Sequence, residues 1–168
     1  LRVPAQQLAG NADDNLAFLD EHGAVVVKPV DGEQGQGVAV NLTTLEDITQ
    51  AVEHARQFDS RVLLESFHAG LDLRIVVIGF EVVAAAIRHP AQVVGDGKHD
   101  IRALIEAQSR RRQAATGGES RIPLDDETER TLRAAGLGYD DVLPAGQRLA
   151  VRRTANLHTG GTLEDVTE

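Results

Sequence analysis

The chain has 168 residues and a formal net charge of −9 at pH 7, which argues against a nucleic acid as its main partner, because nucleic-acid-binding surfaces are basic. It contains no cysteine, so a disulfide framework and a thiolate metal site are excluded. No apolar run approaches the roughly 20 residues of a membrane-spanning helix, and no basic-then-apolar leader is visible, so we expect a cytoplasmic protein without a membrane partner.

The first 70 residues predict two helices and three strands. Residues 25–27 are three valines, a β-branched run that is typical of a buried strand. Asn11 or Asp13 can cap the first helix, and Thr43 with Glu46 has the spacing of a capping box for the second. The expected helices cover residues 11–22 and 43–58, and the expected strands cover residues 25–27, 38–42 and 61–67.

The rest of the chain predicts a β-hairpin, a helical region and a last strand. The hairpin joins residues 72–79 to residues 81–89 by a tight turn, and residues 109–120, basic and then glycine-rich, are expected to form an exposed loop. The other expected elements are a short helix near residues 101–105 capped by Asp100, a helix from Asp125 or Asp126 to about Ala135, a strand over residues 148–154, and an irregular end. This order indicates an α+β fold with antiparallel sheet.

Lys28 follows the buried strand of residues 25–27 and precedes a loop punctuated by glycines. Backbone N–H groups of such a loop can approach phosphate oxygens closely, and the ammonium adds a positive charge, so this segment predicts a polyphosphate site. A strand and not a helix follows Gly35-Gln36-Gly37, which excludes a dinucleotide fingerprint, and Lys28 precedes the glycines, which excludes a P-loop. A plain glycine hairpin with a solvated lysine stays the alternative.

Glu65 lies at the end of a strand whose other residues, 62–64, are apolar. Its carboxylate is either solvated or directed at a ligand. If the strand end lines a cleft, Glu65, the backbone of residues 66–68 and Asp72 could together bind a nucleoside. Backbone groups can read adenine, and a carboxylate accepts hydrogen bonds from ribose hydroxyls.

Arg74 and Arg88 each lie in an otherwise apolar strand of the predicted hairpin. Two arginines on adjacent antiparallel strands could clamp a phosphate or a carboxylate, which their planar guanidinium groups fit. Two exposed arginines on a half-solvated sheet are the alternative. Further along the chain, Asn156 and the pair Gly160-Gly161 form a second turn suited to an anion.

The remaining polar residues show no metal or nucleophile pattern. The six histidines lack metal-ligand spacing, and no serine lies in an elbow motif. Residues 110–112 are three arginines, which we interpret as a solvated face or a substrate-side loop. Arg152 and Arg153 end the last strand beside the second glycine turn. Because the histidines lack metal-ligand spacing, we assign no metal ligand in this chain.

Four segments of the sequence occur in one order: VVVKPVDGEQGQGV, LLESFHAGLDLRIVVIG, VVAAAIRHPAQVVGDGKHDI and RTANLHTGGTLEDVT. In this order they resemble the ATP-grasp ligases, most of all the branch of cyanophycin synthetase and N-acetylglutaminylglutamine synthetase. The resemblance covers most of residues 24–167. Four motifs in the family order are more specific than a lysine followed by glycines.

The resemblance implies a nucleotide cleft made from residues that the sequence already singles out. By position, Lys28 would contact the ATP phosphates, and Gly35, Gln36 and Gly37 would form the flap over them. Adenine would be held by Glu65 and the backbone of Ser66, Phe67 and His68. Asp72 would hold the ribose. Arg74 and Arg88 would face the transferred phosphoryl group or the acyl-phosphate intermediate. Asn156 would lie near the same place as a third catalytic residue, and Gly160 and Gly161 would help to bind the cofactor there.

The implied fold is ATP-grasp, an α+β fold with antiparallel sheets and flanking helices, incomplete at both ends. Residues 1–64 would form the small subdomain with the phosphate flap. Residues 65–168 would form part of the large subdomain, with a helical insert at about residues 95–145. In the family, the acidic residues and the asparagine that hold the metal come after the NLHTGG-like segment, so we expect them downstream of Glu168.

The implied reaction is ATP-dependent ligation of a carboxylate to an amine through an acyl phosphate, with ATP and Mg²⁺ as cofactors. The implied partners are small-molecule acids and amines, such as amino acids or short peptides, and homo-oligomerisation stays an open prediction. We expect the chain to be an ATP-binding part of a longer enzyme that is inactive by itself. A non-catalytic nucleotide-binding or interaction module and a plain α+β domain are the alternatives.

Overall fold

The computed structural model describes residues 3–32 and 35–167 of the chain. The chain consists of two compact units, Leu1–Gly70 and Leu71–Glu168. The sequence places the subdomain boundary slightly earlier, between residues 64 and 65. The strand that contains these two residues pairs within the first unit, which therefore continues past them. The assignment of the units to the small and large subdomains of a family fold stays a prediction.

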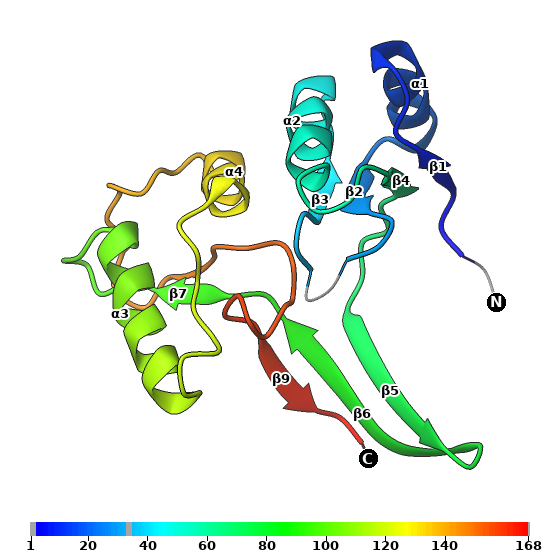
Figure 1. Cartoon of the computed structure of the whole chain (residues 1–168). Helices are drawn as coiled ribbons and strands as arrows, with labels where there is room; N and C mark the ends of the chain where they lie inside the picture. The colour runs from blue at the N-terminus through cyan, green and yellow to red at the C-terminus, as the bar shows by residue number, and fades with distance from the viewer. Residues whose placement is uncertain (1–2, 33–34, 168) are drawn as a thin grey trace. The chain divides into compact units, whose positions relative to one another are not determined.

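The first unit is one antiparallel sheet covered by two helices. Four strands pair in the order β1-β4-β2-β3, and α1 and α2 lie on the same side of the sheet (Figure 1). The elements are β1 (Gln6–Leu8), α1 (Ala12–His22), β2 (Val25–Pro29), β3 (Ala39–Leu42), α2 (Leu45–Ala55) and β4 (Val62–Ser66). The strand, glycine loop and strand predicted around Lys28 are confirmed, because β2 and β3 pair in antiparallel fashion.

Successive side chains of a strand point to opposite faces of the sheet, and the face with the apolar side chains packs against the helices. Along β2, Val25 and Val27 are fully buried, whereas Lys28 between Val27 and Pro29 faces the other side. Helix α2 contributes an apolar stripe in which Ile48 and Val52 are buried at helical spacing. One face of the sheet is therefore packed against the helices, and the other carries the polar side chains of β2 and β4.

Local capping explains where the two helices begin. Asn11 and Asp14 form a reciprocal capping box at the start of α1, as predicted for Asn11. The predicted cap of α2 is wrong by one residue. The cap is Thr44, whose hydroxyl accepts from the Asp47 backbone N–H at 3.1 Å. Thr43 and Glu46 have the same spacing, so the sequence spacing alone does not distinguish the two registers.

The second unit contains two separate antiparallel sheets and two helices. Strands β5, β6 and β9 form one sheet in that order, and β7 pairs with β8 (Figure 1). The elements are β5 (Asp72–Ile78), β6 (Glu81–His89), β7 (Gln92–Val94), α3 (Ile101–Ala115), α4 (Asp126–Ala134), β8 (Arg148–Ala150) and β9 (Thr162–Asp165).

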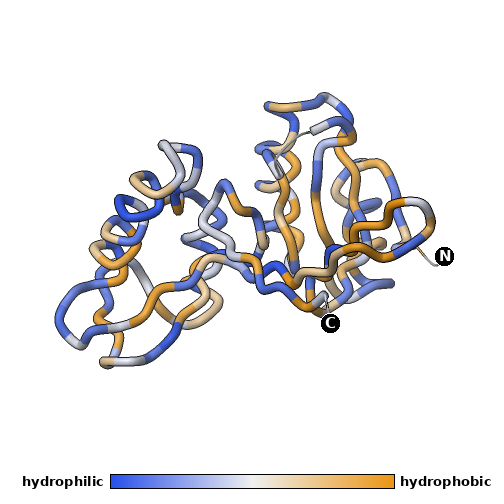
Figure 2. Tube along the Cα trace, turned by 90° about the horizontal axis from the view of Figure 1, so that it is seen from below, coloured by the Kyte–Doolittle hydropathy of each residue, from blue (hydrophilic) through white to orange (hydrophobic). Residues whose placement is uncertain are grey.

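The β5–β6 hairpin is confirmed, and a two-residue turn closes it. Gly79 and Phe80 have φ angles of 58° and 69°, as a two-residue turn of type I′ requires. Both strands are rich in hydrophobic residues (Figure 2), and large apolar side chains such as Val77 and Ile78 are more than half exposed. The phenyl ring of Phe80 is fully exposed at the tip.

A second core lies under helices α3 and α4 and holds this region together. It is built from aliphatic side chains of both helices, of β7 and of the segments that flank β8. The buried members are Ala91, Val93, Ile101, Ile105, Ile122, Leu132, Leu143 and Val151. Asp100 and Asp125 cap α3 and α4 as predicted, by accepting from the N–H groups of Ala103 and Thr128.

Three sequence predictions for the second unit are wrong in extent. Residues 109–115, predicted as a loop, form the last part of α3, because arginine, glutamine and alanine are good helix formers. The end of the chain is not wholly irregular, since β9 pairs with β6. Strand β8 ends at Ala150, because the chain then leaves the sheet and Arg152 forms ion pairs with side chains at the start of α4.

The α+β class with antiparallel sheets and flanking helices is confirmed, since all strand pairs among the described residues are antiparallel. Helices α3 and α4 lie within the predicted insert of residues 95–145. Among the described residues, no helix has the length and apolar character needed to span a membrane.

Candidate functional site

Lys28 and Glu65 meet on the open face of the first unit's sheet. In the β2–β4 register Val26 lies opposite Glu65 and Lys28 opposite Leu63, so the lysine and the glutamate are diagonal neighbours. The Lys28 Nζ lies 2.5 Å from the Glu65 Oε2. Their side chains are 32% and 17% exposed, so the pair is only partly shielded from solvent.

A third side chain completes this group. Gln6 lies opposite Glu65 in the β1–β4 register, and its Nε2 donates to the same Oε2 at 2.6 Å. Two donors therefore fix one oxygen of the carboxylate. The ammonium of Lys28 is held in turn at a defined place on the sheet, a suitable position for a phosphate contact.

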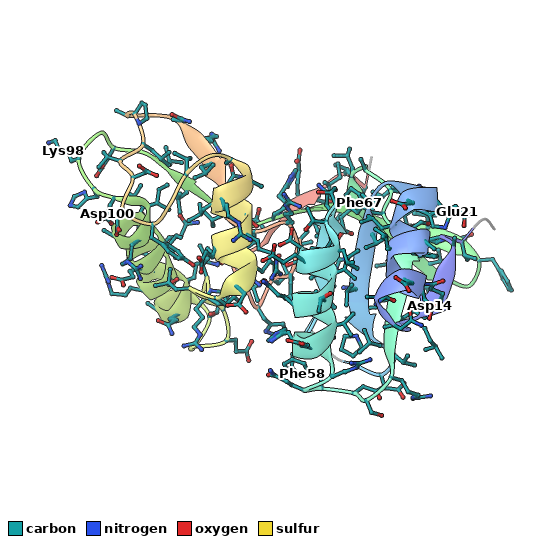
Figure 3. The ribbon with its side chains drawn as sticks, turned by 90° about the horizontal axis from the view of Figure 1, so that it is seen from above. Asp14, Glu21, Phe58, Phe67, Lys98 and Asp100 are labelled. Atoms are coloured by element: carbon teal, nitrogen blue, oxygen red, sulfur yellow. The ribbon has the colours of Figure 1, made fainter. Side chains whose placement is uncertain are left out.

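The glycine loop after Lys28 has the backbone that its sequence suggests. Gly35 and Gly37 have φ angles of 74° and 69°, in the region that favours glycine. A Cβ on Gly37 would lie 2.8 Å from the Phe58 ring and 2.9 Å from Pro29, so a side chain does not fit. Phe58 follows the C-terminal end of α2 (Figure 3).

Gln36 lies between the two glycines and is exposed. The loop's residues 33–34 lie outside the described part of the chain. The described glycines have a conformation that suits a phosphate flap.

The segment after β4, predicted to read adenine, is partly engaged within the unit. The Ser66 N–H donates to the Ala5 carbonyl and the Phe67 N–H donates to the Ala24 carbonyl, both at 2.9 Å. The Ser66 hydroxyl lies 3.1 Å from Nε2 of His68. Adenine recognition here stays a prediction, and it would use backbone atoms other than these two N–H groups.

In the second unit, Asp72 and Arg88 are paired with each other. They lie opposite in the β5–β6 register, and the Nε and Nη2 of Arg88 donate to the Asp72 Oδ1 at 3.0 and 2.8 Å. Arg74 lies opposite Ala86, two positions along, so it shares a face with Arg88 and is exposed. The structure thus brings the two predicted arginines to one face, with Asp72 beside Arg88.

The Asn156 segment is a compact turn. The Asn156 carbonyl accepts from the N–H groups of Thr159 and Gly161 at 3.2 and 2.8 Å, and its Oδ1 accepts from the His158 N–H at 2.8 Å. A Cβ on Gly160 would lie 2.4 Å from Ile122. Both glycines are buried and tightly surrounded, which fixes the shape of this turn.

Arg152, which precedes the Asn156 turn in the sequence, is engaged within the second unit. It is 5% exposed and forms ion pairs with Asp125 and Glu127 of the α4 N-terminus. Burial would raise the pKa of Asp125, but the Arg152 guanidinium and the Thr128 hydrogen bonds lower the pKa further, so it lies below its ordinary value. Arg152 serves the structure of the second unit.

The described residues fit part of a magnesium–nucleotide site. An ammonium and glycine N–H groups suit phosphate oxygens. Among residues 3–32 and 35–167, no group of three or more histidine, aspartate or glutamate side chains could hold a metal ion. His89 and His99 instead pair with Glu164 and Asp96, both within the second unit.

The predicted site residues thus form two sets, one in each unit. Lys28, Gly35, Gln36, Gly37, Glu65, Ser66, Phe67 and His68 belong to the first unit, and Asp72, Arg74, Arg88, Asn156, Gly160 and Gly161 belong to the second. Their roles toward a nucleotide stay predictions.

The sequence does not single out Gln6 or Glu127, and it gives Arg112 only as one of three consecutive arginines. Nothing in the sequence separates buried Glu127 from exposed Glu129, because both lie in the acidic first turn of α4. Only the side-chain contacts identify these three residues.

Comparison with known proteins gives consistent matches. The family model of the prokaryotic glutathione synthetase ATP-grasp domain matches residues 2–140. A cyanophycin synthetase of Trichormus variabilis is 36% identical over 171 residues, which cover 99% of this chain and 19% of that protein. The glutathione biosynthesis bifunctional protein GshAB of Streptococcus thermophilus is 32% identical over 175 residues, which cover 99% of this chain and 23% of that protein.

Among solved structures, a bifunctional glutathione synthetase from Pasteurella multocida is 27% identical, with a TM-score of 0.49. The match covers 99% of this chain and 24% of that one. The chain thus spans about a fifth of the length of the relatives that it matches.

Proposed function

We propose the following function for this chain, which belongs to the ATP-grasp domain family of prokaryotic glutathione synthetases: it forms the ATP-binding part of an ATP-dependent carboxylate–amine ligase. The family consists of ligases that use ATP and Mg²⁺, which confirms the predicted cofactors at the level of the family. The acid and the amine are proposed to be amino acids or short peptides.

The proposed reaction has two steps. A substrate carboxylate oxygen attacks the γ-phosphorus of ATP, the bond to the leaving ADP breaks, and an acyl phosphate forms. The amine then attacks the acyl carbon, loses a proton, and phosphate leaves, so that an amide bond is made. Mg²⁺ supplies charge neutralisation at the phosphates when it is bound.

The residues of this chain would contribute mainly binding and charge. Lys28 would contact the ATP phosphates, and the loop with Gly35 and Gly37 would close over them and exclude water. Arg74 and Arg88, which share one face of the β5–β6 hairpin, would stabilise the negative charge of the transferred phosphoryl group. Asp72 would accept from the ribose and orient Arg88.

The observation that supports this proposal best is the placement of Lys28. It lies on the open face of the sheet, and its ammonium is held by Glu65. The glycine loop follows directly after its strand. A plain hairpin would need neither the lysine nor the buried glycine. A cytoplasmic location and a homo-oligomeric assembly stay predictions.

The experiment is a calorimetric titration with ATP in the presence of Mg²⁺. It compares the wild type with Lys28→Ala and Lys98→Ala. Lys98 provides the matched control, because it is an exposed lysine of the second unit and its removal makes the same charge change. We expect Lys28→Ala to weaken ATP binding about 10- to 100-fold, as the loss of a charged hydrogen bond does. We expect Lys98→Ala to bind like the wild type.

Equal affinities for the two variants would refute the phosphate role of Lys28. If the wild type does not bind ATP, the proposed function is refuted as a whole. Release of ADP and phosphate by the full-length protein with candidate acids and amines then separates a ligase from a non-catalytic nucleotide-binding module.

A further inference from the structure

The loop of residues 153–161 has little regular secondary structure, yet it carries Asn156 and the Gly160-Gly161 pair. Such a loop keeps one shape only through contacts with its surroundings. We propose that Glu127 of α4 and Arg112 of α3 are positioning residues that hold this loop in the shape that the ligase reaction needs. This inference rests on the proposed function.

Glu127 holds the start of the loop. Its Oε1 accepts from the N–H groups of Arg153 and Thr154 at 3.2 and 3.0 Å, and from the Thr154 hydroxyl at 2.8 Å. Its Oε2 accepts from the guanidinium of Arg152. Glu127 is only 9% exposed, so these contacts are shielded from water. One buried carboxylate therefore orients two consecutive peptide groups.

Arg112 holds the end of the loop. Its Nη2 donates to the Gly161 carbonyl at 2.6 Å, and its Nε donates to the Ser120 hydroxyl at 3.1 Å. The Ser120 hydroxyl in turn donates to the Leu157 carbonyl at 2.6 Å. Arg112 thus reaches two carbonyls of the loop, one directly and one through a serine.

The two contacts fix Asn156 because the loop between them is tight. The Gly161 N–H donates to the Asn156 carbonyl at 2.8 Å, which closes the turn. A Cβ on Gly161 would lie 2.8 Å from the Asn156 carbonyl oxygen and 2.9 Å from that of His89. The turn has no room for a side chain at Gly161, so we expect a shift at either end to move Asn156.

The chemistry of the contacts favours positioning over stability alone. Burying charged groups is costly, and well-packed apolar residues often stabilise a core as well or better. Within the described part of the chain, the Nε of Arg152 is buried without a hydrogen-bond partner. One member of the Arg152 network, Glu127, also accepts from the backbone N–H groups of Arg153 and Thr154.

The experiment compares Glu127→Gln and Arg112→Gln with Glu129→Gln and Arg110→Gln. The two controls make the same charge changes on the same helices at exposed positions. Hydrogen exchange of the amides of residues 153, 154 and 161 is measured without nucleotide. In the full-length protein, kcat and the KM for ATP are measured at a temperature at which every variant is folded.

We expect Glu127→Gln to accelerate exchange of the Arg153 and Thr154 amides about tenfold or more, since they lose a charged acceptor. We expect kcat to fall about 10- to 100-fold in both test variants, because a small misplacement of a reacting group has a large effect on rate. The KM for ATP should change less than about threefold, because Lys28 is untouched. The controls should stay within about twofold of the wild type.

Conservative replacements sharpen the test. Arg112→Lys keeps one charged donor for the Gly161 carbonyl and should recover part of the kcat lost in Arg112→Gln. If Glu127→Gln does not fold, Thr154→Val removes only the 2.8 Å hydroxyl contact and should lower kcat by about threefold.

Faster exchange with an unchanged kcat would overturn the proposal, since the loop would then lie outside the site. A loss of kcat that only follows the folded fraction would overturn it too, because the role would be structural. Both outcomes leave ATP binding by the wild type intact. A wild type that neither binds ATP nor turns over would show instead that the proposed function has failed, and the inference with it.

Discussion

Lys28 and Glu65 form an ion pair across β2 and β4, with 2.5 Å between Nζ and Oε2, on the face of the sheet opposite the one that packs against α1 and α2. The pair is diagonal in the antiparallel register, and Gln6 from β1 donates to the same oxygen. Three strands therefore determine where the ammonium lies. Since both side chains are partly exposed, the pair contributes little to stability and is free to serve a ligand.

The first prediction concerns the strength of this pair. In a double-mutant cycle with Lys28→Met and Glu65→Gln, we expect a coupling free energy of about 0.5–1 kcal/mol, because the pair is partly exposed. The coupling should decrease at 1 M salt, where the screening length falls to about 3 Å. Urea unfolding at low and high salt measures it. A coupling near zero at low salt would contradict the contact.

The second prediction concerns Gly37. Gly37→Ala should lower the free energy of unfolding by about 2–4 kcal/mol, since a Cβ meets Phe58 and Pro29 at a positive φ angle. Gly23→Ala is the matched control: its φ is 73° and nothing lies within 4 Å of the added Cβ. It should lose only about 1–2 kcal/mol, the strain of a side chain at a positive φ angle. Chemical denaturation measures both. Equal losses would mean that Phe58 does not crowd Gly37.

The third prediction concerns the pH dependence of the Arg152 network. The pKa of Asp125 is lowered in the folded state, so the stability it contributes is present above its unfolded pKa of about 3.9 and is lost as the pH falls through the folded pKa. Asp125→Asn keeps an acceptor for the Thr128 N–H but removes the charge beside Arg152.

The wild type should therefore be more stable than Asp125→Asn between about pH 5 and 7, and the difference should shrink below about pH 4. Unfolding free energies measured across this range test the sign. Asp126→Asn, an exposed neighbour in the same helix, should show a smaller difference. A difference that grows on acidification is the outcome that would rule out the assigned ion pair.

The fourth prediction concerns the hairpin turn. Phe80 has a φ angle of 69° and a fully exposed ring, so it is strained without burial in return. Phe80→Asn should raise the free energy of unfolding by about 0.5–1 kcal/mol, because asparagine tolerates this conformation better. Thermal unfolding of the two proteins is sufficient to measure it. A destabilised variant would mean that the ring is packed against something.

Much of the fold follows from local sequence features. The caps Asn11, Asp100 and Asp125 mark the starts of α1, α3 and α4, and the Gly79-Phe80 pair marks the hairpin turn. These features act within four residues, so the sequence contains all of the information needed. The cap of α2 was missed because Thr43 and Thr44 satisfy the same spacing.

Longer-range features could not be predicted in this way. Strand β9 exists because β6 offers a free edge, and the Thr162–Asp165 segment has no strong pattern of its own. The arginines of residues 110–112 look alike in sequence, yet Arg112 alone among them contacts Gly161. The rotation of each residue around the helix axis decides which arginine faces the loop. The sequence predicts a loop at residues 110–112, which gives no basis for choosing among them.

By itself, the sequence determined the α+β class, the strand, glycine loop and strand around Lys28, and the family, because local propensities and ordered motifs are written in consecutive residues. Only the tertiary structure decided that Glu65 holds the lysine and is held by Gln6, and that Asp72 pairs with Arg88. It also decided that Glu127 and Arg112 contact the two ends of the Asn156 loop. The physical reason is that these contacts depend on strand register and helical phase. Both are set when distant segments pack together.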